Sequence, residues 1–222
     1  MTFEWRWDFT WEIMPRLLWA TGNTLMASGI GYAIAMVLGL VLALAQRSNW
    51  RPLTFVTREF IEFIRSTPLV LQIFFIFYVG PQFGIRLSPW VSGMIAIGLH
   101  YSAYLSEVYR AGIEAVPKGQ WEACRALNMS TRDTYMRIVI PQALPPSIPG
   151  MGNYLVGIFK DTPMLSVIGV AELMQTANAI GSETYRFLEP FTMVGVIFLA
   201  LSLPTAGLVR LLELRVRRKM GM

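Results

Sequence analysis

The sequence predicts an all-α, polytopic membrane protein with five transmembrane helices in a single domain, residues 1–222. Hydrophobic residues make up 54% of the chain and charged residues only 15%, which is too apolar for a soluble domain of this length. Long uncharged runs recur along it, and a helix needs about 20 apolar residues to cross a bilayer. No secretory signal is evident, so we expect the first apolar run to direct membrane insertion.

The predicted elements follow one another along the chain. Residues 1–16 mix tryptophan with charge, which predicts an amphipathic segment at the outer membrane face, where tryptophan is favoured. Lys160–Pro163 closes the fourth span, and residues 164–189 then form an amphipathic outer segment. The spans are expected, in order, at residues 24–45, from 62 or 66 to 79, 90–108, 145–159 and 191–209.

The distribution of basic residues predicts the orientation in the membrane. An odd number of spans places the two termini on opposite sides, and lysine and arginine collect on the cytoplasmic side. With the C-terminus inside, only five of the 19 Lys and Arg residues lie outside: Arg6, Arg16, Arg86, Lys160 and Arg186. The basic residues are spread along loops rather than gathered on one face, so no nucleic-acid partner is predicted.

The charged stretch 117–141 lies between apolar spans, and the predicted orientation places it in the cytoplasm. Its pattern indicates two short helices. The first covers residues 120–127 and ends at Asn128, a residue type that tolerates left-handed backbone geometry, so we expect a positive φ there. Ser130, with Asp133 three residues later, can cap the second helix. We expect Pro141 to end that helix, because the residue before a proline disfavours the α region.

Several polar residues lie within the predicted spans. His100, Tyr101, Tyr104 and Glu107 all belong to the third span, and ionisable groups at this depth usually face the bundle interior or a water-filled cavity. For Gln72 in the second span we favour a hydrogen bond between helices over contact with a ligand.

The residues required for catalysis by this chain alone are missing. There is no P-loop, so ATP is not expected to bind here, and one His with one Cys gives no transition-metal set. We expect no cofactor on this chain. Cys124 cannot form an intramolecular disulfide and is expected to pack as a small residue.

Three stretches carry a resemblance to a known family. Glu122-Ala123-Cys124, Asn128 and the Ile138–Pro141 stretch resemble the coupling motif of ABC importer permeases, with Cys, Asn and Ile where that motif has Ala, Gly and Leu. STPLVLQ in the second span and KDTPMLSVIG after the fourth resemble signatures of the polar amino-acid branch. The whole chain resembles the permease subunit of a type I ABC importer of the histidine, glutamine or arginine type and of related opine or ectoine permeases.

This resemblance implies a function and a set of partners. The chain would be the membrane subunit of an ATP-driven importer for a polar or zwitterionic amino acid or derivative, in a bacterial cytoplasmic (inner) membrane. ATP would be hydrolysed on a separate dimer of ATP-binding subunits. A second permease chain or copy, membrane lipid and an extracytoplasmic solute-binding protein would complete the system. The residues implied to couple to the ATPase are Glu122, Ala123, Cys124, Asn128, Ile138 and Pro141.

The resemblance also implies solute-binding residues, with Glu107, Lys160 and Asp161 as the main candidates and His100 and Thr162 as weaker ones. A zwitterion needs an anion for its amino group and a cation for its carboxylate. The same side chains could instead form ion pairs that only hold helices together. An ion-coupled carrier or channel without an ATPase is the alternative function, although it leaves stretch 117–141 unexplained. A membrane-embedded enzyme would lack a nucleophile or metal set.

Overall fold

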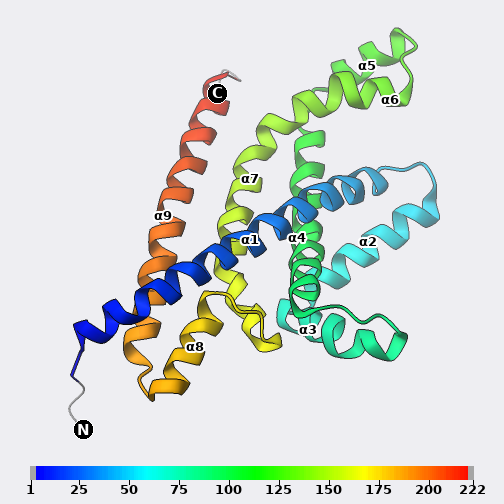
Figure 1. Cartoon of the computed structure of the whole chain (residues 1–222). Helices are drawn as coiled ribbons and strands as arrows, with labels where there is room; N and C mark the ends of the chain where they lie inside the picture. The colour runs from blue at the N-terminus through cyan, green and yellow to red at the C-terminus, as the bar shows by residue number, and fades with distance from the viewer. Residues whose placement is uncertain (1–3, 220–222) are drawn as a thin grey trace.

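The computed structural model describes residues 4–219, and within this range the chain is helical and has no strand (Figure 1). Four short helical segments of the described chain are not α-helical. Two are π-helices, η1 (Phe75–Val79) and η3 (Thr134–Val139), and two are 3₁₀-helices, η2 (Gly80–Phe83) and η4 (Thr162–Ile168). The α-helices are α1 (Trp7–Ala45), α2 (Arg51–Ser66), α3 (Leu69–Phe74), α4 (Pro89–Glu114), α5 (Lys118–Ala126), α6 (Thr131–Asp133), α7 (Ile140–Asp161), α8 (Leu173–Thr184) and α9 (Leu188–Lys219).

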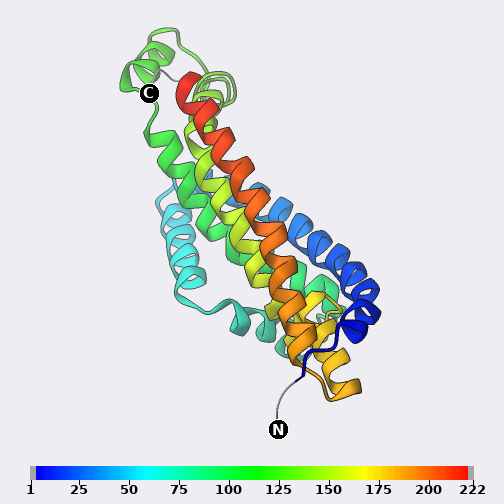
Figure 2. The ribbon, with the colours of Figure 1, turned by 90° about the vertical axis from the view of Figure 1, so that its left-hand side faces the viewer.

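Helix α4 is central to the packing. It is crossed by α1 and accompanied by α7, and α9 packs against α7 in turn (Figures 1 and 2). Small residues allow α1 and α4 to approach closely, since a Cβ atom added at Gly98 would lie 2.5 Å from Cγ2 of Ile34. The main core forms around this crossing and against η4, and its fully buried side chains include Ile97, Leu105, Ile158 and Leu165.

The start of α1 and the end of α9 lie at opposite ends of the molecule. The start of α1 lies near α8, whereas α5, α6 and the end of α9 lie at the other end (Figures 1 and 2). Helix α8 begins within the expected outer segment and is capped by Glu172, whose Oε1 accepts a hydrogen bond from the backbone N–H of Gln175 at 2.7 Å. Arg16 of α1 forms an ion pair with Glu183 of α8 at 2.7 Å.

Helix α1 is longer than the sequence pattern predicts. It runs without a break from Trp7 through Pro15 to Ala45, so the expected segment 1–16 is not a separate helix, and residues 1–3 lie outside the described range. Its 39 residues correspond to about 58 Å, well beyond the roughly 30 Å of a hydrocarbon core. An oblique path across α4 accommodates this length (Figure 1).

The predicted second span is broken. Helices α2 and α3 meet at 107°, because Thr67 before Pro68 is extended, with φ −109° and ψ 137°. By length and composition, α1 and α9 can each cross a membrane, and up to four spans result if each bent helix pair in the described chain counts as one. The number of five spans is not confirmed.

The expectation that Pro141 ends a helix is wrong. The helical run Thr131–Ile168 passes through it, and Ile140 keeps helical geometry at φ −59° and ψ −46°. Pro141 is the second residue of α7 and follows the π-helical η3, where the regular i to i−4 hydrogen bonds are already interrupted, so its missing N–H is tolerated. At Lys160–Pro163, where an interruption was predicted, the same helical run continues but changes its winding, since α7 ends at Asp161 and the 3₁₀-helical η4 begins at Thr162.

Candidate functional site

The loop that joins α4 to α7 forms two helical arms with a left-handed turn between them. Asn128 has φ 49°, which confirms the expected turn. Ser130 caps α6, because its Oγ accepts a hydrogen bond from the backbone N–H of Asp133 at 3.1 Å and donates one to that residue's carboxylate at 2.7 Å. The first arm is α5, within one or two residues of its predicted bounds.

Aromatic contacts hold the two arms together. The rings of Trp121 on α5 and Tyr135 on η3 meet edge to face with centroids 5.5 Å apart. Arg47, just after α1, lies with its Cζ 5.5 Å from the centre of the Trp121 ring, and its Nε donates to the Tyr135 hydroxyl at 3.3 Å. The sequence pattern did not identify these three residues as supports of the loop.

The residues predicted to couple to an ATPase do not all lie on one surface. Glu122 and Ala123 are exposed, whereas Cys124 is only 4% exposed and packs inward, as its small size suggested. Ile138 is half-buried and Pro141 is exposed. Two large apolar side chains that sequence reasoning missed are strongly exposed on the same loop, Leu127 at 74% and Met136 at 63%. Both side chains offer apolar area that a partner docking on this loop would bury.

The positive φ of Asn128 gives a prediction about the turn. We expect Asn128→Gly to keep the loop intact, because glycine adopts left-handed geometry freely, whereas Asn128→Val should destabilise it by about 1–2 kcal/mol or more. Thermal unfolding of the two purified variants checks this. Equal unfolding temperatures for the glycine and valine variants would contradict it.

A cavity of about 610 Å³ lies between α4 and α7. Within each helix, the residues that line the cavity are adjacent or three to four positions apart. The lining residues of α4 therefore share one face of that helix, and those of α7 share one face of theirs. Both faces are polar although the helices are largely apolar. The lining residues are His100, Tyr101, Tyr104, Val108, Gly150, Asn153, Tyr154, Gly157 and Asp161.

The three tyrosines of the cavity form an aromatic cluster, and one of them binds a carboxylate. The Tyr101 hydroxyl donates a hydrogen bond of 2.6 Å to Oδ2 of Asp161, which ties α4 to α7. The Tyr154 ring lies 6.1 Å from that of Tyr101 and 5.5 Å from that of Tyr104. Arg65 at the end of α2 contributes a cation, with its Cζ 5.5 Å from the centre of the Tyr104 ring. Carboxylate, guanidinium and aromatic faces therefore lie within one region.

The predicted solute-binding residues separate into two groups. Asp161 and His100 line the cavity, whereas Glu107, Lys160 and Thr162 do not belong to its lining. Lys160 is exposed, and the buried Thr162 hydroxyl donates to the Phe159 carbonyl at 2.8 Å.

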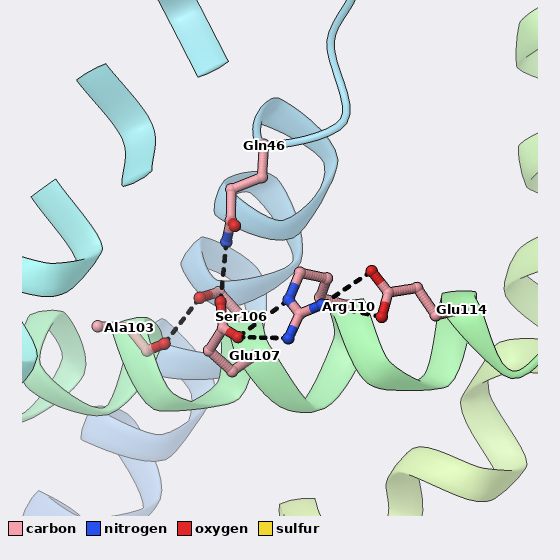
Figure 3. Close-up of polar contacts among 6 residues, drawn as sticks. All are labelled: Gln46, Ala103, Ser106, Glu107, Arg110 and Glu114. Atoms are coloured by element: carbon pink, nitrogen blue, oxygen red, sulfur yellow. Dashed lines mark hydrogen bonds and ion pairs between the residues drawn. The ribbon is translucent and has the colours of Figure 1, made fainter. Parts of the chain in front are cut away.

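Glu107 lies within a polar cluster of its own. Its carboxylate accepts hydrogen bonds from Gln46 at 3.2 Å and from Nε of Arg110 at 2.9 Å (Figure 3). Arg110 also binds Glu114 at 2.8 Å, so the Glu107 ion pair is made with the next turn of α4 rather than with Lys160. This cluster joins the end of α1 to α4.

Some cavity residues were missed by sequence reasoning. Asn153 and Tyr154 lie in the predicted fourth span, in which no candidate residue was identified. Arg65, which contacts the cavity residue Tyr104, was not identified either. The available signal was the spacing of Gly150, Asn153, Tyr154 and Gly157, which places these small and polar residues on one face of α7.

Comparison with known proteins defines the class. The fold is that of an ABC importer permease: a solved structure described as an amino acid ABC transporter with histidines matches with a TM-score of 0.87 and 33% identity, over 97% of this chain and 100% of the other. A methionine ABC transporter structure at 15% identity and a TM-score of 0.69 shares the fold. Residues 17–218 match the family model of the binding-protein-dependent transport system inner membrane component, and the chain belongs to this family.

Relatives along the full length agree with this assignment. A probable amino-acid ABC transporter permease protein of Sinorhizobium fredii is 40% identical over 99% of this chain and 98% of its own length. The glutamine transport system permease protein GlnP of Escherichia coli is 32% identical over 98% and 99%. The L-cystine permease TcyB of Bacillus subtilis is 40% identical over 78% and 76%.

Family membership establishes the general role of the chain. It is a membrane-embedded transport subunit of the inner membrane and not an enzyme, since the ATPase of such systems is a separate subunit. ATPase and solute-binding partners are general to this family. The alternative of an ion-coupled carrier or channel receives no support from these relatives.

Proposed function

We propose that this chain is the membrane-spanning subunit of an ATP-driven importer that carries a polar or zwitterionic amino acid, or a derivative of one, into the cytoplasm. The observation that carries the proposal is the polar cavity between α4 and α7, with the Asp161 carboxylate in its wall. The amino-acid permeases among its relatives support the same solute class.

The side chains of the cavity match the chemistry of a zwitterion. Asp161 in the cavity wall supplies a negative charge for an ammonium group. The guanidinium of Arg65 is not part of the lining but lies against the Tyr104 ring, where it supplies a positive charge for a carboxylate. Both interactions are stronger in a cavity of low dielectric constant than in water. The Tyr101, Tyr104 and Tyr154 rings supply faces that favour a cationic group. A role in solute binding stays a prediction for the three residues outside the lining, Glu107, Lys160 and Thr162.

The assembly completes the mechanism. One ATP-binding subunit docks on the loop between α4 and α7, and another docks on the corresponding loop of a second permease chain or copy, which forms the other half of the pathway. ATP binding closes the ATPase dimer and moves these loops, and hydrolysis on the partner subunits resets them. We place the N-terminus outside and the C-terminus inside, which is supported by the loop and the C-terminus lying at one end of the molecule (Figure 1).

Replacement of Asp161 tests the solute site. In proteoliposomes with the ATPase and solute-binding subunits, Asp161→Asn should raise the KM for uptake about 10- to 100-fold, because a charge-assisted hydrogen bond contributes about 1.5–3 kcal/mol. Asp8→Asn, at an exposed carboxylate near the start of α1, is the matched control. ATPase association should persist in both variants.

The outcome also separates the candidates. Glu107→Gln and Lys160→Met are predicted to lower transport if their side chains contact the solute during the cycle. Wild-type uptake by Asp161→Asn would place the solute elsewhere. The solute class itself is tested by ATP-dependent uptake of a panel of labelled amino acids, and uptake that persists without the ATPase would contradict the importer.

A further inference from the structure

The break between α2 and α3 is closed by the side chain of Gln72. Helix α2 ends at Ser66, and the Ile64 carbonyl has no backbone N–H partner four residues further on because that residue is Pro68. The amide nitrogen of Gln72 donates to the Ile64 carbonyl at 2.8 Å and to the Thr67 carbonyl at 3.2 Å. It also lies 2.8 Å from the Thr67 hydroxyl oxygen. Gln72 itself is buried, at 7% exposure.

These contacts determine which way the Gln72 amide points. Backbone carbonyl oxygens only accept hydrogen bonds, so the nitrogen of the amide must face them, and the oxygen must face the other way. On that other side the amide Oε1 lies 3.2 Å from Nδ1 of His100 on α4. This contact also confirms the expected hydrogen bond between helices.

The orientation of the amide in turn determines the tautomer of His100. An amide oxygen cannot donate, so Nδ1 of His100 must carry the hydrogen in this contact. A neutral imidazole has a single N–H group, which leaves Nε2 with a free lone pair. His100 lines the cavity proposed to hold the solute, and no hydrogen bond within residues 4–219 uses its Nε2.

The neighbouring hydroxyl hydrogens are already engaged. The rings of Tyr101 and Tyr104 lie 5.4 Å and 5.1 Å from the His100 ring. The Tyr101 hydroxyl donates to Asp161 at 2.6 Å, and that of Tyr104 donates to the Arg65 carbonyl at 3.4 Å. Neither of these two side chains therefore supplies a hydrogen to His100 Nε2.

We propose that Gln72 is a positioning residue that holds His100 in the Nδ1–H tautomer, so that Nε2 accepts a hydrogen bond from an N–H group of the transported solute. This inference rests on the proposed function of the cavity and adds a specificity element to it. With Asp161, the cavity then offers two acceptors. It favours solutes that carry an N–H donor in addition to the ammonium group.

The single histidine of the chain makes the tautomer directly measurable. The full-length chain, purified without a histidine tag and labelled with ¹⁵N-histidine, is placed in lipid nanodiscs for NMR without solute. We expect Nδ1 to be protonated and Nε2 to be unprotonated. Gln72→Leu should shift the population toward Nε2–H, and Gln82→Leu, at an exposed glutamine of η2, should leave the wild-type spectrum unchanged. A wild-type spectrum with Nε2 protonated, or an unchanged tautomer in Gln72→Leu, overturns the proposal.

Two substitutions of His100 test the contact with solute even if Gln72→Leu fails to fold. Asparagine places its amide near the Nδ1 position and keeps the contact with Gln72, but offers no acceptor at the Nε2 position. Glutamine reaches the Nε2 position with an amide oxygen. We expect His100→Asn to raise the KM about tenfold with kcat nearly unchanged, and His100→Gln to stay closer to the wild type. The reverse order would assign His100 a purely structural role and overturn the proposal.

The two proposals fail in different ways. The tautomer is measured without solute, so it can prove wrong while Asp161→Asn still impairs uptake. Conversely, unimpaired uptake by Asp161→Asn removes the solute site whatever the tautomer of His100.

Discussion

Replacing Glu122 with lysine is expected to abolish association with the ATP-binding subunits while the chain remains folded in the membrane. Glu122 is exposed on α5 and makes no hydrogen bond or ion pair to the described residues, so its replacement removes no internal contact. Charge reversal in a docking surface juxtaposes like charges, which costs several kcal/mol. We expect co-purification of the ATPase and solute uptake to be lost together.

A second variant tests the same surface through its apolar part. Leu127, 74% exposed at the end of α5, should contribute buried area on docking, and Leu127→Asp should weaken ATPase binding to a similar extent. Glu12→Lys, at an exposed carboxylate near the start of α1, is the matched control because it lies toward the opposite end of the molecule (Figure 1). Normal uptake with Glu122→Lys would show that docking uses another surface.

Local rules predicted the loop between α4 and α7 well. Asparagine is one of the few non-glycine residue types that tolerate a positive φ, so Asn128 marks the turn between the two helices. Ser130 followed by Asp133 is a short-range capping pattern. Both features depend on neighbouring residues only. Charge and proline within an apolar run also marked the position, at Lys160–Pro163, where α7 gives way to the 3₁₀-helical η4. Such signals are contained in the sequence itself.

The helix predictions at two prolines failed because the outcome does not depend on neighbouring residues alone. Pro141 lies in a continuous helical run because the preceding π-helical segment already interrupts the regular hydrogen bonds, so the missing N–H is tolerated, and this change of winding is not visible in the local pattern. Pro68 instead breaks the second span, although both prolines follow residues of similar character. A local preference against helix is therefore decided by the surrounding contacts.

The solute cavity was predicted only in part. His100 and Asp161 were identified as polar groups within or next to spans, and both line the cavity. Glu107 belonged to the same helix and had the same signal, but its position relative to Arg110 and Gln46 depends on how α1 packs against α4. Helix spacing predicts a shared face, but not which member of that face meets a cavity.

The close contact between α4 and α7 should be very sensitive to side-chain size at Gly112. A Cβ atom there would lie 2.6 Å from the carbonyl oxygen of Ala143 and 2.1 Å from Oγ of Ser147. The serine can rotate, but the carbonyl belongs to the α7 backbone, so the two helices would have to separate. We expect Gly112→Ala to destabilise the protein by about 1–3 kcal/mol, as measured by thermal unfolding.

The same variant should impair transport beyond its effect on stability, because α4 and α7 lead directly into and out of the loop that docks the ATPase. Gly195→Ala is the matched control, since nothing lies within 4 Å of its added Cβ and alanine favours the helix by about 0.5–1 kcal/mol. Adding Ser147→Ala to Gly112→Ala should restore only part of the lost stability, because the contact with the Ala143 carbonyl remains. Full recovery in the double variant would show that the serine hydroxyl, and not the approach of the two backbones, limits the size of residue 112.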